Sequence, residues 1–123
     1  MLYQDRTKLD FISGVPGTIY YDWKSYGGFG VDVSGTITGG QYLLIQGSID
    51  GNIWTTLFTV DSGINPPTQV TNNQIIATGR YVCNIVAYPQ GRIKTSDSFT
   101  GTVGLSASMT VDTPSDVAQV LGG

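Results

Sequence analysis

Residues 41–60 read QYLLIQGSIDGNIWTTLFTV, and this stretch decides the fold class. Two runs rich in strand-forming residues flank the pair Asp50-Gly51. An Asp-Gly pair between such runs is typical of a tight hairpin turn, because both residues tolerate positive φ angles. The sequence therefore predicts an antiparallel hairpin with strands at residues 41–48 and 53–60.

The same two-residue period appears on both sides of this hairpin. Phe29, Val31 and Val33 alternate with small or polar residues, as expected for a half-buried strand. Residues 102–110 alternate in the same way. Further short runs lie between turns containing Gly or Pro, which makes about eight strands at the spacing typical of sandwiches and barrels. The predicted fold class is all-β, an antiparallel β-sandwich or jelly-roll-like barrel.

The two ends of the chain lack this alternation. Residues 1–16 are expected to form an N-terminal arm or a loosely docked edge, and residues 17–110 the β-sandwich domain. Residues 111–123 are expected to form a C-terminal arm or a short helix, because Thr113 or Ser115 could cap a helix start. A helix this short is marginal in isolation. The C-terminal segment is therefore either a frayed end or an arm that docks on a neighbouring copy.

The composition argues against catalysis. The chain of 123 residues contains no histidine, the commonest general base and metal ligand. Its nine acidic residues are all Asp. Most of the candidate catalytic acids lie beside Gly or Ser at predicted turns, where Asp has a structural role; these candidates are Asp22, Asp32, Asp50, Asp61 and Asp97. The single cysteine, Cys83, is expected to be a small buried hydrophobic residue within a strand. We expect no enzyme activity, no cofactor and no metal site.

The charge pattern limits the possible partners. The formal net charge is −3, whereas nucleic-acid binding requires a basic surface. The N-terminal sequence is polar and no stretch has the length of a membrane span. We therefore expect no nucleic-acid or membrane partner, and assembly in a cytosol. A surface this poor in charge permits association between copies, so a homo-oligomer is expected.

Candidate contact residues are aromatic or belong to the C-terminal segment. Aromatic side chains are enriched in the cores of interfaces, and flat aromatic rings also bind sugars in carbohydrate-binding modules. Some of these aromatic residues are expected to be core residues instead. A carbohydrate-binding module using Tyr20, Trp23 or Tyr26 is the alternative from another functional class. The candidate contact residues are Tyr20, Tyr21, Trp23, Tyr26, Val117, Val120 and Leu121.

Three motifs in order resemble a pattern found in virion proteins of tailed bacteriophages. Residues 29–36 (FGVDVSGT) precede residues 46–54 (QGSIDGNIW), which are similar to the hairpin motif GS-x-DG-x-x-W of those proteins. Residues 78–82 (TGRYV) resemble the strand that follows it, and residues 100–107 (TGTVGLSA) resemble the closing strand. The resemblance covers the central part of the chain and excludes both ends.

This resemblance implies a β-sandwich in the virion and supplies no catalytic residues. The implied function is a capsid decoration (cement) protein that stabilises the head through contacts between subunits. A neck, tail or fibre-base component is the alternative. The implied partners are the major capsid protein, other virion proteins and further copies of the same chain.

Overall fold

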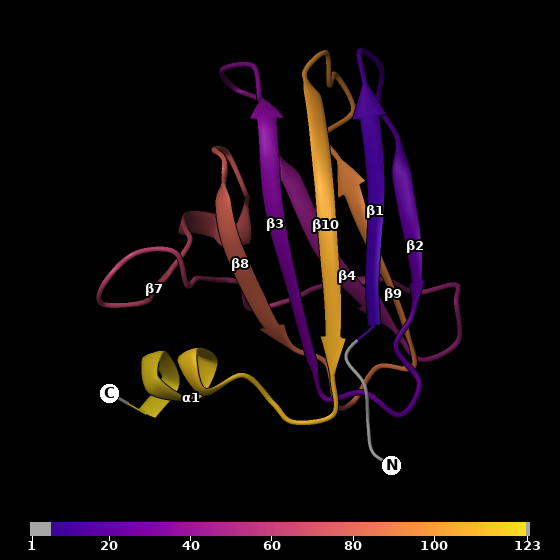
Figure 1. Ribbon diagram of the computed structural model, residues 1–123. Helices are drawn as coiled ribbons and strands as arrows, with labels where there is room; N and C mark the ends of the chain where they lie inside the picture. The colour runs from indigo at the N-terminus through magenta and orange to yellow at the C-terminus, as the bar shows by residue number, and fades with distance from the viewer. Residues whose placement is uncertain (1–5, 123) are drawn as a thin grey trace.

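The chain forms two antiparallel β-sheets that pack face to face (Figure 1). The structure is a computed structural model that describes residues 6–122. Sheet A has the strand order β1 (Arg6–Ser13), β10 (Thr102–Thr110), β3 (Gly28–Thr36), β8 (Gly79–Asn84), β6 (Val60–Asp61) and β7 (Thr68–Gln69). Sheet B has the order β2 (Thr18–Asp22), β9 (Gln90–Thr95), β4 (Leu43–Ser48) and β5 (Thr55–Thr56). The predicted all-β antiparallel sandwich is confirmed, and the described strands do not close into a barrel.

The core lies between the sheets and is supplied by the alternating residues of the long strands. On β3, Phe29, Val31 and Val33 are buried while Asp32 and Ser34 are exposed, as the alternation predicts. The four apolar residues of β10 also point inward, opposite small residues on the outer face. Burial of such side chains stabilises the fold by about 1.5–3 kcal/mol each relative to their exposure. These inward residues of β10 are Val103, Leu105, Ala107 and Met109.

Trp23, immediately after β2, is the largest fully buried side chain. Its indole lies 5.0 Å from the Phe29 ring, centroid to centroid, in a tilted arrangement. It also lies directly over the backbone of Gly91 in β9, because a Cβ placed there would be 2.1 Å from the indole. Trp23 therefore bridges the two sheets at a point where β9 must lack a side chain.

The predicted hairpin is correct at its turn and wrong in its second strand. Only Thr55–Thr56 pairs with β4, and Leu57 adds one hydrogen bond from its N–H to the carbonyl of Ile45. The chain then passes into sheet A, where Val60–Asp61 pairs with β8. Thr59 is fully buried at this crossing, and its hydroxyl donates to the Leu57 carbonyl. Residues 53–60 therefore contribute to both sheets instead of forming one strand.

The described parts of both chain ends pack on the sandwich. Residues 6–13 form β1, which pairs along its length with β10 and lies at the edge of sheet A. Of the two alternatives expected for the N-terminal segment, these residues form the docked edge and not the arm, and residues 1–5 lie outside the described part. At the other end the short helix occurs as α1 (Ser115–Gly122), next to β8 and β6 (Figure 1). No described helix has the length or apolarity to cross a membrane.

Candidate contact site

The aromatic candidates divide between the core and the surface. Trp23 is 0% exposed and Tyr21 is 6% exposed, because alternation along this part of the chain directs both side chains inward. Their proposed role as surface contacts is therefore wrong. Tyr26 is half-buried and packs against the core. Tyr20 is 58% exposed and is the one aromatic candidate that projects fully from the surface.

The C-terminal candidates divide in the same way. Val117 is buried and fixes α1 against the sandwich, so its contact is within the chain. Val120 is half-buried, and Leu121 is 65% exposed near the end of the helix. Only Leu121 and part of Val120 are available to another molecule. The apolar face predicted for this segment therefore serves mainly to dock the helix on its own domain.

A cluster on the outer face of sheet B brings Tyr20 together with two residues that the sequence analysis did not select. The strand register aligns Tyr20 of β2 with Arg92 of β9, and Arg92 with Gln46 of β4. The Arg92 guanidinium carbon lies 4.3 Å from the centroid of the Trp54 ring. The rings of Tyr20 and Trp54 are 5.9 Å apart. We call Tyr20, Trp54 and Arg92 the aromatic–arginine cluster.

Hydrogen bonds fix the position of Arg92 within this cluster. Its Nε–H donates to Oε1 of Gln46 at 2.7 Å, and Nε2 of Gln46 donates to the Thr56 hydroxyl at 3.1 Å. Gln46 is itself a buried residue. The guanidinium is therefore held from one side by a bonded amide and from another by an indole ring. Cation–π contacts of this kind stabilise by about 0.5–1 kcal/mol at exposed sites.

Trp54 and Arg92 were not predicted as contact residues, because alternation does not tell which face of a strand packs on the core. Trp54 shares one face of the predicted strand with Thr56 and Phe58, and that strand was expected to extend to Val60. The real strand ends early, so Trp54 stays beside Arg92 on the outer face of sheet B, while Val60 is buried in sheet A, where it pairs with Val82 of β8. The Asp50-Gly51 turn followed by Trp54 was the available signal, because such a turn fixes the residues after it across from β4.

The turn beside this cluster is rigid and carries exposed apolar side chains. The Asp50 carboxylate accepts the N–H groups of Asn52 and Ile53 at 2.8 and 3.0 Å. These bonds, that of Ile53 foremost, lower the pKa of Asp50 below its ordinary value. Ile49 and Ile53 are 73% and 74% exposed on this turn. Two large aliphatic side chains are thus presented to solvent by an ordered loop.

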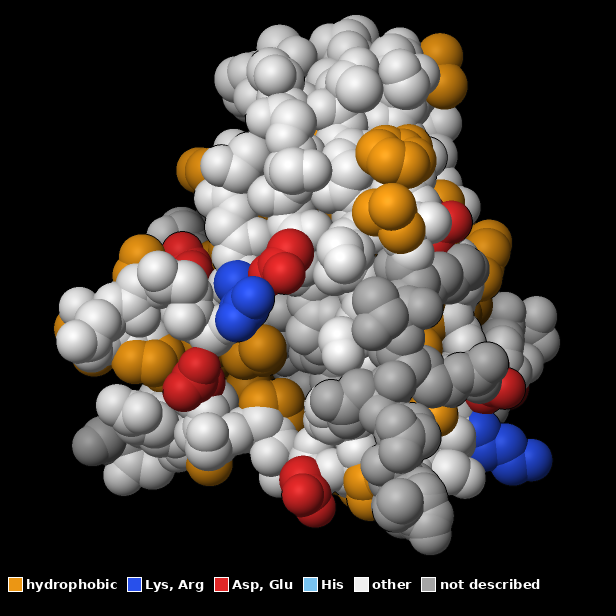
Figure 2. Space-filling view, in the orientation of Figure 1, with side chains coloured by type: hydrophobic (Ala, Val, Ile, Leu, Met, Phe, Trp, Pro, Cys, Tyr) orange, Lys and Arg blue, Asp and Glu red, His pale blue; other side chains and the backbone are white. Residues whose placement is uncertain are grey.

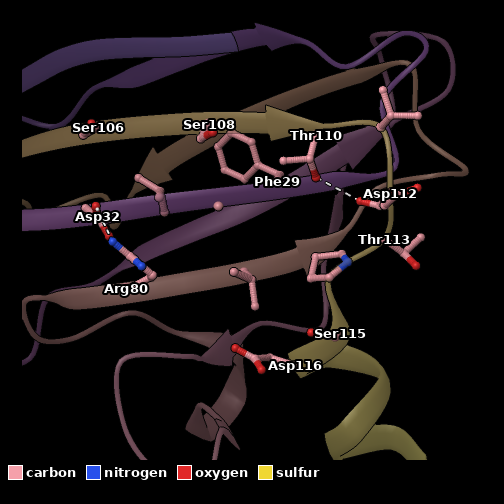
Figure 3. A pocket seen from close by; sticks show the side chains of 15 residues that line it. Phe29, Asp32, Arg80, Ser106, Ser108, Thr110, Asp112, Thr113, Ser115 and Asp116 are labelled. Carbon is pink, nitrogen blue, oxygen red and sulfur yellow. Dashed lines mark hydrogen bonds and ion pairs between the residues drawn. The ribbon is translucent and has the colours of Figure 1, made fainter. Parts of the chain in front are cut away.

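The outer face of sheet A carries a wide groove of about 810 Å³ (Figure 3). Its floor includes Ser106 and Ser108 of β10, and the segment leading into α1 forms one wall. The Arg80 guanidinium closes another side through a 2.7 Å ion pair with Asp32. Both partners of this pair are largely exposed, so it contributes little to stability. The groove is open, and its lining combines polar side chains with apolar ones such as Val82 and Pro114.

Figure 2 looks onto this same face and shows apolar side chains gathered over the β1 side of sheet A. Leu9 and Phe11 of β1 are the exposed apolar residues of that strand. The Phe11 ring lies close to the backbone of Gly104, since a Cβ there would be 3.2 Å from it. Part of this apolar surface therefore covers the neighbouring strand.

The described residues contain no group of three His, Cys, Asp or Glu side chains placed to hold a metal ion. Burial raises the pKa of the Cys83 thiol to about 12, and Thr59 is its hydrogen-bond partner at 3.5 Å. The thiol therefore stays protonated and has the structural role expected from the sequence.

The fold defines the class of the protein as a two-sheet antiparallel β-sandwich. No protein-family model and no curated protein sequence matches the chain. Among solved structures, the fold is similar to the crystal structure of the SPBc2 prophage-derived protein YomS, with a TM-score of 0.66. The two chains are 12% identical, and the match covers 89% of this chain and 96% of that one. At this identity the likeness shows a common fold.

Proposed function

We propose that this chain is a non-catalytic structural protein of a bacteriophage particle, and specifically a capsid decoration (cement) protein. It binds the head as a homo-oligomer and stabilises the shell through contacts with the major capsid protein. Its location is then the virion, after assembly in the host cytoplasm. Neck, tail or fibre-base positions are the alternative locations within the same particle.

The observation that carries this proposal is the fold shared with a prophage-derived protein along nearly the whole of both chains. Two further features support it. Three motifs resemble those of tailed-phage virion proteins in the same order. Large aliphatic side chains such as Ile49, Ile53 and Leu121 are exposed on ordered elements, as expected of a protein that works by contact.

The carbohydrate-binding alternative receives less support. Of the three aromatic residues on which it depends, Trp23 is fully buried and Tyr26 is half-buried. Of the three, Tyr20 is the one that is mainly exposed. A Trp23→Ala variant would therefore test folding instead of sugar binding.

The proposal is tested on phage particles assembled with and without this chain. We expect heads that lack it to release their DNA at lower temperature and in lower salt, and added purified protein to restore the resistance. Equal resistance of both particles would contradict the cement function. Density for the chain in an intact particle would distinguish the capsid from the neck, tail or fibre base.

A further inference from the structure

The guanidinium of Arg92 has a fixed orientation and unused hydrogen-bonding capacity. Its Nε–H donates to Gln46, and its central carbon lies over the Trp54 ring. Within the described chain, no residue accepts a hydrogen bond from its Nη nitrogens, and no carboxylate forms an ion pair with it. A fixed guanidinium whose outer nitrogens remain available loses little side-chain entropy when it binds an anion.

Two other basic residues, Arg80 and Lys94, form ion pairs with carboxylates of the same chain. Arg80 is paired with Asp32, and Lys94 is paired with Asp97 at 3.4 Å. Among the described residues, Arg92 has no carboxylate partner, in a chain whose net charge is −3. The positive charge of Arg92, with its Nη groups available, favours an anionic group from another molecule.

The surroundings of Arg92 favour a carboxylate on a protein over a nucleic-acid phosphate. Arg92 and Lys94, two cations on the outer face of β9 in an acidic chain, fall short of the basic footprint that a polyphosphate backbone requires. A planar guanidinium matches a carboxylate through two parallel N–H···O bonds. The neighbouring Ile53, directly before Trp54, offers aliphatic surface that a polypeptide side chain can cover.

We propose that the aromatic–arginine cluster is a docking site for an acidic, aliphatic segment of a partner protein. A partner Asp or Glu carboxylate accepts hydrogen bonds from the Nη groups of Arg92. Aliphatic side chains of the same segment pack on Tyr20, Trp54 and Ile53. Tyr, Trp and Arg are the residue types that most often dominate binding energy at interfaces. The source of the segment rests on the proposed function, since in a particle it would belong to another virion protein.

The test uses the full-length chain and two synthetic peptides, one of alternating aspartate and leucine and one in which asparagine replaces aspartate. Binding is followed by NMR through the indole N–H of Trp54 and the Nε–H of Arg92. We expect the aspartate peptide to shift both signals and the asparagine peptide to bind at least about tenfold more weakly, as for loss of a charge-assisted pair. Equal binding of the two peptides, or no shift up to about 1 mM aspartate peptide, overturns the proposal.

Arg92→Gln and Lys94→Gln are matched variants, because both remove one positive charge from the outer face of β9. Arg92→Gln is expected to weaken binding about tenfold or more, and Lys94→Gln to leave it within about twofold. Similar weakening by both variants would indicate general charge attraction and overturn the site. The indole signal of buried Trp23 reports whether each variant is folded, and Arg92→Lys, which keeps the charge and loses the planar fork, replaces Arg92→Gln if that variant unfolds.

Two further results separate this proposal from its neighbours. Shifts of the cluster signals with protein concentration alone, without peptide, would identify a second copy of the chain as the occupant and overturn the partner segment. Absence of peptide binding together with stabilisation of phage heads would reject the docking site and leave the proposed function standing. Peptide binding without any effect on phage heads would support the docking site and reject the proposed function.

Discussion

At the scale of single residues, close approach of the two sheets depends on where side chains are missing. Gly91 lies on β9 opposite Tyr21 of β2 and Gly47 of β4, and the Trp23 indole fills the space above it. Gly47 likewise lies under the Tyr88 ring, where a Cβ would be 2.6 Å from the nearest ring atom. Two aromatic rings therefore pack directly on the backbone of sheet B, at the paired glycines Gly47 and Gly91.

Substitution of Gly91 tests this arrangement. Gly91→Ala would place a Cβ about 2.1 Å from the ring of Trp23, so the indole must move out of its rotamer. We expect the free energy of unfolding to fall by about 3 kcal/mol, the upper part of the range for overpacked cores. Gly39→Ala is the control, because nothing lies within 4 Å of that position. Unfolding of both variants at the same urea concentration would contradict the prediction.

Asp50 gives a pH-dependent contribution to stability. Hydrogen bonds from the N–H groups of Ile53 and Asn52 lower its pKa in the folded state, below the value of about 3.9 for an unfolded chain. The charged carboxylate therefore stabilises the fold at neutral pH, and this contribution is lost as the pH falls from about 4 through the lowered folded pKa. We expect the stability of the wild type relative to Asp50→Asn to decrease over that range, measured by urea unfolding at several pH values.

The control for this measurement is Asp97→Asn, because the Asp97 side chain is 99% exposed and accepts only one distant bond from Lys94. Parallel pH curves for the wild type and Asp50→Asn would show that the turn carboxylate contributes nothing. The same curves for Asp97→Asn fix how much a surface carboxylate changes the profile by its charge alone.

At the scale of elements, the sequence predicts the long strands that stay within one sheet. β3 and β10 pair with each other and follow strict alternation, so their bounds and inward residues were predictable. The bounds of β5 and β6 were not predictable, because the chain passes from sheet B to sheet A between them and the alternation of residues does not reveal this change. β1 was missed because Leu9 and Phe11, its most visible apolar residues, lie on the outer face.

The same limit explains the mixed result for the contact residues. Tyr20, Tyr21 and Trp23 are almost consecutive, so about half of them must be core whichever way β2 faces. Only the packing of Trp23 on Gly91 fixes that choice. The partner of Tyr20, Arg92, is distant in the sequence and becomes its neighbour through the register of β2 with β9.

The helix α1 depends on one anchor. Val117 is the buried residue of this eight-residue helix, which is too short to be stable without tertiary contacts. Val117→Asp is expected to release α1 and to remove amide-exchange protection from residues 115–122, while β3 and β10 remain protected. Hydrogen exchange followed by NMR measures both effects.

Leu121→Asp is the matched control, since it places the same charge on the same helix at a position that is 65% exposed. Its amide protection is expected to resemble that of the wild type. Loss of protection in both variants would mean that a charge anywhere in the helix is disruptive, and that Val117 is no special anchor.

At the scale of the whole molecule, Cys83 reports on global opening. It lies on β8, which has β3 on one side and β6 on the other, and its thiol is fully buried with a pKa raised to about 12. Access for a thiol reagent therefore requires that the two sheets separate.

We expect Cys83 to react with a thiol reagent only in the fraction of molecules that is unfolded at equilibrium, at a reagent concentration low enough that refolding outpaces labelling. The labelling rate should rise with urea with the same dependence as the global unfolding equilibrium. Thr38→Cys supplies an exposed thiol in the same chain as an internal reference for rapid labelling. Rapid labelling of Cys83 without denaturant would indicate local opening at β8 and contradict this view of the core.

The pairing of β1 with β10 determines how the domain responds to mechanical load. The register runs from Arg6 opposite Met109 to Ser13 opposite Thr102, so the start of β1 and the end of β10 lie at the same end of the sheet. Tension applied at positions 6 and 109 therefore parts the strands one pair at a time, like a zip. Tension applied at positions 6 and 102 loads all pairs together in shear. We expect a lower rupture force in the first geometry, measured with an optical trap, so a pull along this axis would peel β1 away and expose the long edge of β10 first.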